Sequence, residues 1–184
     1  MNINEGDSVM HWTHGLGKVI QLEERALSGK AILYYAIQIG DMTVWVPADD
    51  MLESRLRLPT HAAEFKKLIG TLSHPGEPLL HDRRERKTLL MEWLKDGRTE
   101  SLFRVIRSLS TYQQAHPLNL DEQTLLKRSK DRLVGEWSYA MSVTVAQAED
   151  ELYRLLTPAV LGVEENHFED TDRKEVSSVV SLRL

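Results

Sequence analysis

The sequence predicts an α+β protein with two domains: a small N-terminal β-barrel of the Tudor or SH3-like kind, followed by an all-α helical bundle. In residues 1–58, short runs of alternating apolar and polar side chains are separated by tight turns, a pattern typical of small antiparallel barrels. From residue 59 to about residue 160, the apolar residues recur at helical spacing instead. Residues 161–184 are acidic and then rich in Val and Ser, which is typical of a disordered tail or an added strand.

Four strands are expected in the first domain. The last two are rich in β-branched and aromatic residues, and Gly40-Asp41 lies between them as a tight hairpin turn. A further turn is expected at Ser28-Gly29-Lys30. The four expected strands cover residues 7–12, 18–22, 32–39 and 42–47.

Five helices are expected in the second domain, packed around a core of their own. Gly97 suits the left-handed position that ends a helix. Asn119 with Glu122, and Thr144 with Gln147, have the spacing of capping boxes at the starts of the last two helices. The expected helices cover residues 60–72, 82–95, 99–114, 119–141 and 144–157.

The stretch HWTHGLG, residues 11–17, could be a metal clip, a phosphate-binding loop or a turn. His11 and His14 have no acidic pair or second histidine pair nearby at metal-ligand spacing. The Gly-x-Gly has no third glycine at the dinucleotide-binding position, and no helical pattern follows it to hold an anion. We therefore expect a turn between antiparallel strands, with Gly at a positive φ angle, and we expect no metal or other cofactor.

Composition argues against an enzyme and against a membrane protein. The chain has no cysteine, so it has no thiolate nucleophile or thiolate zinc site, and it has no Gly-x-Ser-x-Gly elbow. No apolar run approaches the ~20 residues of a membrane span, and the polar N-terminus does not resemble a signal peptide. The net charge is -5, but residues 60–117 are net basic, so contacts with nucleic acid should come from this middle region. We expect a cytoplasmic protein without a small-molecule substrate.

Several short motifs occur in an order that resembles the CarD/CdnL family of bacterial transcription regulators. The resemblance covers most of the chain and omits the acidic tail. Its first part resembles the RNA-polymerase-interacting domain that this family shares with the transcription-repair coupling factor. The motifs are Gly6-Asp7-x-Val9, His14-Gly15-x-Gly17-x-Val19, Tyr35, Val46-Pro47, Glu77-Pro78, Arg83-Arg84 and Gly97.

The resemblance implies that the first domain binds the β subunit of RNA polymerase by adding its sheet to a strand there. Arg25 and Leu27 stand at positions that face the polymerase in the family. Residues 43–47 would form the edge strand, with Trp45, Val46 and Pro47 at the interface. Trp45 stands where the family typically has arginine. It could anchor the interface or lie in the barrel core, and both interpretations stay open.

The resemblance also implies that the helical domain contacts promoter DNA at the upstream edge of the −10 element. There the family inserts a tryptophan into the minor groove, and the matching position here is His81. Leu80 or Leu79 could replace that wedge, or the leucines could instead pack at the entry to a helix. The following basic residues suit phosphate contacts, although a solvated helical face with local ion pairs is the alternative. These residues are Arg83, Arg84, Arg86 and Lys87.

A second basic cluster, Lys127, Arg128, Lys130 and Arg132, lies on the fourth expected helix. Taken together, these features predict a cytoplasmic regulator, associated with the nucleoid through RNA polymerase. It would bind the polymerase β subunit and promoter DNA and modulate the stability of the open complex. The alternative is a polymerase-binding adaptor whose helical domain binds another protein rather than DNA.

Overall fold

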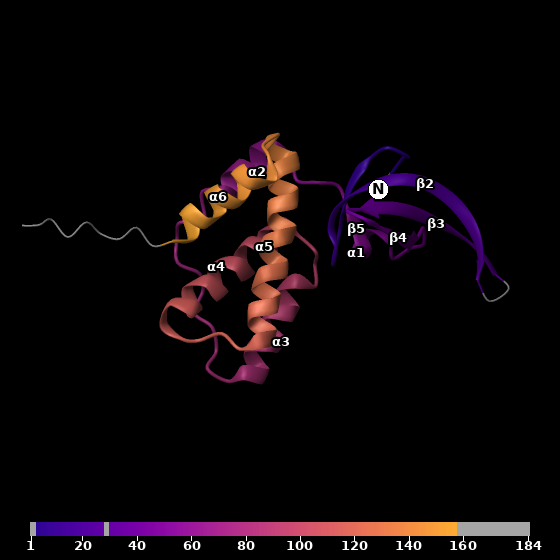
Figure 1. The fold of residues 1–184 in the computed structure, drawn as a ribbon. Coiled ribbons are helices and arrows are strands. Elements are labelled where there is room, and N and C mark those ends of the chain that lie inside the picture. The colour runs from indigo at the N-terminus through magenta and orange to yellow at the C-terminus, as the bar shows by residue number, and fades with distance from the viewer. Residues whose placement is uncertain (1–2, 28–29, 158–184) are drawn as a thin grey trace, which may run out of the picture.

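The computed structural model of the protein describes residues 3–27 and 30–157, and it places a β-sheet beside a group of helices (Figure 1). The sheet has five antiparallel strands in the order β4-β3-β2-β1-β5. Its strands are β1 (Ser8–His11), β2 (Gly15–Leu27), β3 (Lys30–Ile39), β4 (Met42–Pro47) and β5 (Leu56–Arg57), with a short helix α1 (Leu52–Arg55) before β5.

The sheet is open rather than closed into the predicted barrel. Among the described residues, the edge strands β4 and β5 do not pair with each other. β5 has only two residues and pairs with β1 alone among the strands that the structure describes, so it does not bridge to the opposite edge. The predicted β domain followed by helices is confirmed, whereas closure of the barrel is not seen.

Two glycines shape the turn and the strand at the start of β2. Gly15 has a φ of +84°, as the predicted turn requires, and Gly17 lies inside the strand. A Cβ atom at Gly17 would come within 2.6 Å of the Ile37 side chain on the neighbouring strand, so only glycine fits there. The hairpin turn at Gly40 is also confirmed, with a φ of +56°. Of the other predicted turn, residues 28 and 29 lie outside the described residues.

The helical part confirms the five predicted helices, with ends shifted by a few residues. Both predicted capping boxes form, at Asn119 with Glu122 and at Thr144 with Gln147. Gly97 has a φ of +66°. The helices are α2 (Ala62–Ile69), α3 (Arg83–Leu94), α4 (Thr99–Ala115), α5 (Leu120–Met141) and α6 (Val145–Leu156). No helix in the part of the chain that the structure describes is long and apolar enough to cross a membrane.

Helix α5 lies at the centre of the helical part and also contacts the sheet (Figure 1). The helices share an apolar core, separate from the core of the sheet. Burial of such side chains contributes about 1.5–3 kcal/mol each to folding. The most deeply buried members include Phe65, Leu90, Leu102, Phe103, Ile106, Leu109 and Leu133.

The two parts are joined through Glu136, a fully buried carboxylate on α5. Arg57 of β5 donates to both of its oxygens, at 2.6 and 2.7 Å. The backbone N–H and the hydroxyl of Thr60 each donate to it at 2.8 Å, and the hydroxyl of Thr99 on α4 lies at 3.2 Å. Burial by itself would raise the pKa of Glu136, but these hydrogen bonds and the charge of Arg57 outweigh it and hold the pKa below its ordinary value.

His11 fixes the turn between β1 and β2. Its ring is buried, and Nδ1 accepts hydrogen bonds from the backbone N–H groups of Thr13 and His14, both at 3.2 Å. The pKa of His11 is lowered to about 4, first by burial and then by the charges of His14 and Arg132. A neutral imidazole with this nitrogen engaged is a structural acceptor. Among the described residues, no group of three or more His, Asp or Glu side chains could hold a metal ion.

Replacing Glu136 by Gln is expected to cost ~3 kcal/mol of unfolding free energy, because it leaves Arg57 partly buried without its counter-charge. Glu77→Gln is the matched control, since Glu77 also binds an arginine through both oxygens but at the surface. That exposed pair should contribute less than ~1 kcal/mol. Urea unfolding of the two variants measures the difference, and equal losses would contradict the role assigned to the joint.

The low pKa of His11 predicts that the fold loses stability in acid. The unfolded chain, with a histidine pKa of about 6.5, takes up this proton before the folded chain does. His11 therefore does not change the free energy of unfolding above pH ~6.5. As the pH falls from ~6.5 to ~4, proton uptake by the unfolded chain lowers that free energy by up to ~3 kcal/mol.

His11→Asn tests this expectation, because an Asn oxygen can accept the same backbone N–H groups without titrating. Urea unfolding between pH 7.5 and pH 4.5 should show a smaller loss for the variant than for the wild type. Parallel losses would show that His11 is not the responsible group.

Candidate interaction surfaces

Arg25 and Trp45 form a stack on the outer face of the sheet. The Arg25 guanidinium of β2 lies 3.2 Å from the centroid of the Trp45 ring of β4. Val46, next to Trp45, is 2% exposed and belongs to the core on the opposite face. Trp45 is therefore half-buried under Arg25 rather than part of the sheet core. Such a cation–π contact contributes ~0.5–2 kcal/mol and holds both side chains at the surface.

The predicted edge strand is an edge of the sheet, because β4 pairs with β3 alone among the described strands. The side chain of Val46 is not available to a partner, so this residue can contribute only its main chain. Pro47 is half-buried and has no N–H to donate. Leu27 is the last residue of β2, where its backbone pairs with Lys30. Of the predicted polymerase residues, Trp45, Val46 and Pro47 therefore lie on the edge strand, and Arg25 stacks on Trp45 at the outer face of the same sheet.

Helix α3 begins at Arg83, where the predicted basic cluster starts. The Asp82 side chain caps it by accepting from the backbone N–H groups of Arg84 and Glu85, at 2.8 and 2.9 Å. The side chains of Arg83 and Arg84 are exposed, and within the described part of the chain neither forms an ion pair. Lys87 is exposed as well and pairs with Asp121 at 2.9 Å.

Arg86 is a correction to the predicted DNA contacts. It is 5% exposed and forms a buried ion pair with Glu122 at 2.7 Å. It also donates to the carbonyl oxygens of Leu80 and His81, at 2.6 and 3.0 Å. Every third or fourth residue of α3 faces the helical core, and Arg86 falls on that side. Its structural role is to hold the segment that contains Leu80 and His81.

The predicted wedge segment presents Leu80 and His81 to solvent. Leu79 is 9% exposed and packs in the core, whereas Leu80 is 45% exposed. The exposed His81 ring lies edge-on to the ring of His116, with centroids 5.8 Å apart, and His116 contacts Tyr112 at 4.8 Å. Sequence reasoning missed His116, because a His-Pro pair at the end of a helix indicates only where that helix stops.

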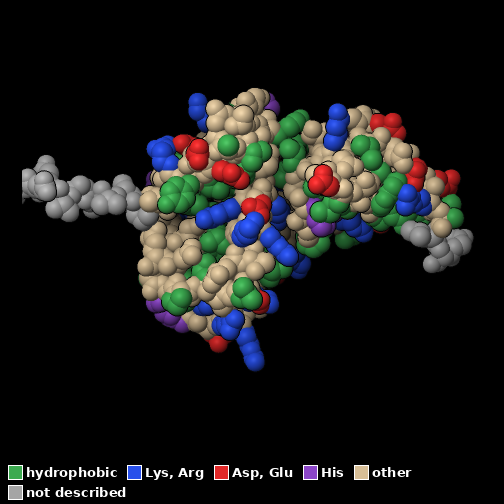
Figure 2. Space-filling view, viewed as in Figure 1, with side chains coloured by type: hydrophobic (Ala, Val, Ile, Leu, Met, Phe, Trp, Pro, Cys, Tyr) green, Lys and Arg blue, Asp and Glu red, His purple; other side chains and the backbone are tan. Residues whose placement is uncertain are grey.

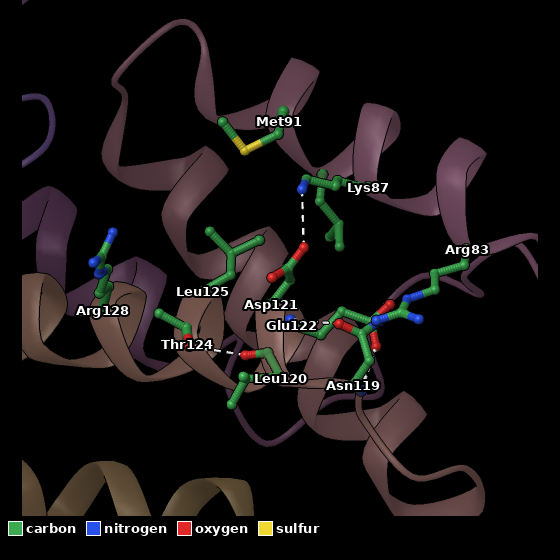
Figure 3. Close-up of a pocket in the computed structure, with 11 residues that line it drawn as sticks. Arg83, Lys87, Met91, Asn119, Leu120, Asp121, Glu122, Thr124, Leu125 and Arg128 are labelled. Atoms are coloured by element: carbon green, nitrogen blue, oxygen red, sulfur yellow. Dashed lines mark hydrogen bonds and ion pairs between the residues drawn. The ribbon is translucent and has the colours of Figure 1, made fainter.

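A groove of about 330 Å³ separates α3 from α5 (Figure 3). Arg83 and Lys87 of α3 and Arg128 of α5 line it together with apolar side chains, among them Leu90 and Leu125. Asp121 and Glu122 line it as well, but they pair with Lys87 and Arg86, so within the described residues Arg83 and Arg128 are the lining cations without an ion-pair partner. Arg128 belongs to the second basic cluster of the sequence, so the fold brings the two clusters to one groove. Figure 2 shows Lys and Arg side chains gathered in the middle of the visible face, between the helices and the sheet. This arrangement suits an anionic partner.

Comparison with known proteins identifies the class of protein. Residues 3–63 match the model of the CarD-like/TRCF RID domain, and residues 67–153 match that of the CarD C-terminal domain. The chain belongs to the CarD-like family of transcription regulators. It is 25% identical over 144 residues to the "Putative transcription factor YdeB" of Bacillus subtilis (strain 168), a match that covers 77% of this chain and 94% of that protein.

The family implies interaction with RNA polymerase through the first of these domains. The boundary between the two matched regions falls between residues 63 and 67. In the structure, the last strand ends at Arg57 and α2 begins at Ala62. The order of parts along this chain is therefore the order of the two family domains.

Proposed function

We propose that this protein binds the β subunit of RNA polymerase with its sheet and promoter DNA near the −10 element with its helical part, and thereby changes the stability of the open complex. The observation that carries the proposal is the position of the two proposed binding surfaces, the β4 edge of the sheet and the helical part. The free edge β4 lies at one side of the sheet, while β1, β5 and the start of β2 adjoin the helical part at the other. Both partners can therefore be bound at once.

The polymerase contact is proposed to combine main-chain pairing along β4 with the Arg25–Trp45 stack. An exposed edge offers unpaired N–H and C=O groups to a strand of the partner. Tryptophan and arginine are enriched among the residues that dominate binding energy at protein interfaces. Because the stack is already formed in the free protein, little side-chain entropy is lost on binding.

The DNA contact is proposed to use Arg83, Arg84 and Lys87 for phosphates, with Leu80 and His81 at the fork junction. The exposed arginines lie in the first turn of α3, directly after the exposed wedge segment. Arg86 holds that segment in place by donating hydrogen bonds to the carbonyl oxygens of Leu80 and His81. An apolar or planar side chain at such a position can hold a distorted base step.

The proposed mechanism is thermodynamic linkage. A protein that binds the open promoter complex more tightly than the closed one shifts the equilibrium by the difference of its affinities. The joint at Glu136 fixes the two surfaces relative to each other, so a given position on the polymerase determines which DNA position α3 can reach.

The alternative is an adaptor whose helical part binds a protein instead of DNA. The groove between α3 and α5 is the observation that favours this alternative, because leucines line it and an apolar side chain of a partner would fit there. The histidine at the wedge position also presents less area than the family's tryptophan.

Arg25→Glu and Trp45→Ala are each expected to weaken binding to purified RNA polymerase by at least tenfold, because each removes half of the exposed stack. Trp12→Ala is the matched control, since Trp12 is also exposed, at 46%, but adjoins Gly97 on the helical side of the sheet. Surface plasmon resonance on immobilised polymerase measures the three affinities. Retained affinity in both stack variants would refute this binding face.

The DNA contact is tested with fluorescence anisotropy on a labelled −10 fork-junction promoter in complex with RNA polymerase. The wild type should slow decay of the open complex. Arg83→Glu with Arg84→Glu should abolish that effect. The double variant should also lower the salt slope, which is the slope of the logarithm of the binding constant against the logarithm of the salt concentration, by about two, because about one counterion is released for each phosphate contact. His81→Ala should shorten the lifetime and leave the salt slope unchanged.

The double reversal Lys66→Glu with Lys67→Glu on α2 is the control, because both lysines are exposed and lie on a different helix. A protein that binds polymerase but leaves the DNA complex unaffected would be the adaptor. In that case Arg83 and Arg84 would be dispensable for every readout on DNA.

A further inference from the structure

A second cleft lies where the sheet meets α5. It has a volume of about 560 Å³, and the turn between β1 and β2 forms one wall. Thr13, His14 and Gly15 line it from that turn, and Arg128, Asp131 and Arg132 line it from α5. Neither wall belongs to the wedge segment or to the Arg25–Trp45 stack.

The cleft carries positive charge that the protein itself does not neutralise. Within the described residues, neither Arg128 nor Arg132 forms an ion pair, and the Nε atom of Arg132 is buried without a hydrogen-bond partner. Asp131, the acidic residue of this lining, pairs with Lys127 at 2.8 Å. Burial and the charge of Arg57 lower the pKa of Arg132, and Glu136 opposes them only in part. Holding a cation there costs free energy that a bound anion would recover.

The turn that faces these arginines is preformed. The buried acceptor His11 fixes the backbone of Thr13 and His14, so the exposed His14 is held at the entrance. Gly15 packs directly on α5: a Cβ atom there would lie 3.3 Å from Cγ of Arg132, and its φ of +84° also requires glycine. The stretch HWTHGLG is therefore a turn, as expected, but one shaped against an arginine of the other domain.

Arg128 connects this cleft with the groove between α3 and α5, because it lines both. A series of arginines thus runs from Arg83 on α3 over Arg128 and Arg132 on α5, and the His14 ring lines the cleft from the sheet side. Basic side chains gather over the same region in Figure 2. A series of this kind fits the regularly spaced phosphates of a nucleic-acid strand better than a single small anion.

We propose that the cleft between α5 and the β1–β2 turn binds a backbone phosphate of the promoter DNA, so that the sheet domain contacts DNA as well as polymerase. The inference rests on the proposed function, since it extends the DNA surface of α3 across the joint. β1 lies on the opposite side of β2 and β3 from the edge strand β4, so DNA at the cleft leaves the polymerase edge free.

Arg132→Gln and His14→Glu test the cleft in the polymerase complex on fork-junction DNA. Each is expected to weaken binding to that complex about tenfold, the value of one charge-assisted hydrogen bond, and Arg132→Gln should lower the salt slope by about one. Binding to polymerase without DNA should stay as in the wild type. Arg132→Lys keeps the charge and should retain most of the salt slope, which separates a phosphate contact from a packing role at the joint.

Arg154→Gln is the matched control, because Arg154 is an exposed arginine on α6 that lines neither the groove nor the cleft. If Arg83→Gln lowers the salt slope while Arg132→Gln and His14→Glu leave it at the wild-type value, the cleft proposal is wrong and the DNA contact of α3 stands. If Arg83→Gln also leaves the salt slope at the wild-type value, both the proposed DNA function and the cleft proposal are wrong.

Discussion

The buried carboxylate of Glu136 is the interaction on which the arrangement of this protein depends. It receives hydrogen bonds from the last strand, from the segment after that strand and from α4. A buried charge is tolerated only when it is fully paired, so these elements must meet in one arrangement for Glu136 to be satisfied. The same contact that stabilises the fold therefore fixes the angle between the sheet and the helices, and with it the relative position of the two proposed binding surfaces.

The strand order of the sheet separates the proposed polymerase-binding edge from the contact with the helices. Among the described strands β4 forms one edge of the sheet, whereas Arg57 of β5 and Gly15 of β2 contact α5. Small residues where β2 begins let α5 approach closely, since Gly15 lies against Arg132 and Gly135 of α5 faces Leu16. The stretch HWTHGLG thus forms the turn, contacts α5 and provides one wall of the charged cleft.

Most of the fold could be predicted because its signals are local. Apolar spacing and capping residues such as Asn119 placed the helices to within a few residues. What the sequence could not reveal depends on partners far away along the chain. In the sequence Arg86 belongs to a basic cluster, and only the structure shows that it is buried in an ion pair with Glu122. His116 meets His81 only because α3 and α4 fold back on each other. The two-residue strand β5 has no periodicity to detect.

An acidic protein with a net charge of -5 would bind free DNA weakly, because long-range repulsion opposes the local attraction of a few cations. In the proposed function, docking on polymerase changes this balance. Once the sheet is bound, the proposed DNA contact would be intramolecular, with an effective concentration that reaches the millimolar range for a short connection of suitable geometry. A rigid joint preserves that geometry, whereas a flexible one would spread α3 over many positions. Weak phosphate contacts would then suffice, and the overall negative charge would disfavour binding to DNA that carries no polymerase.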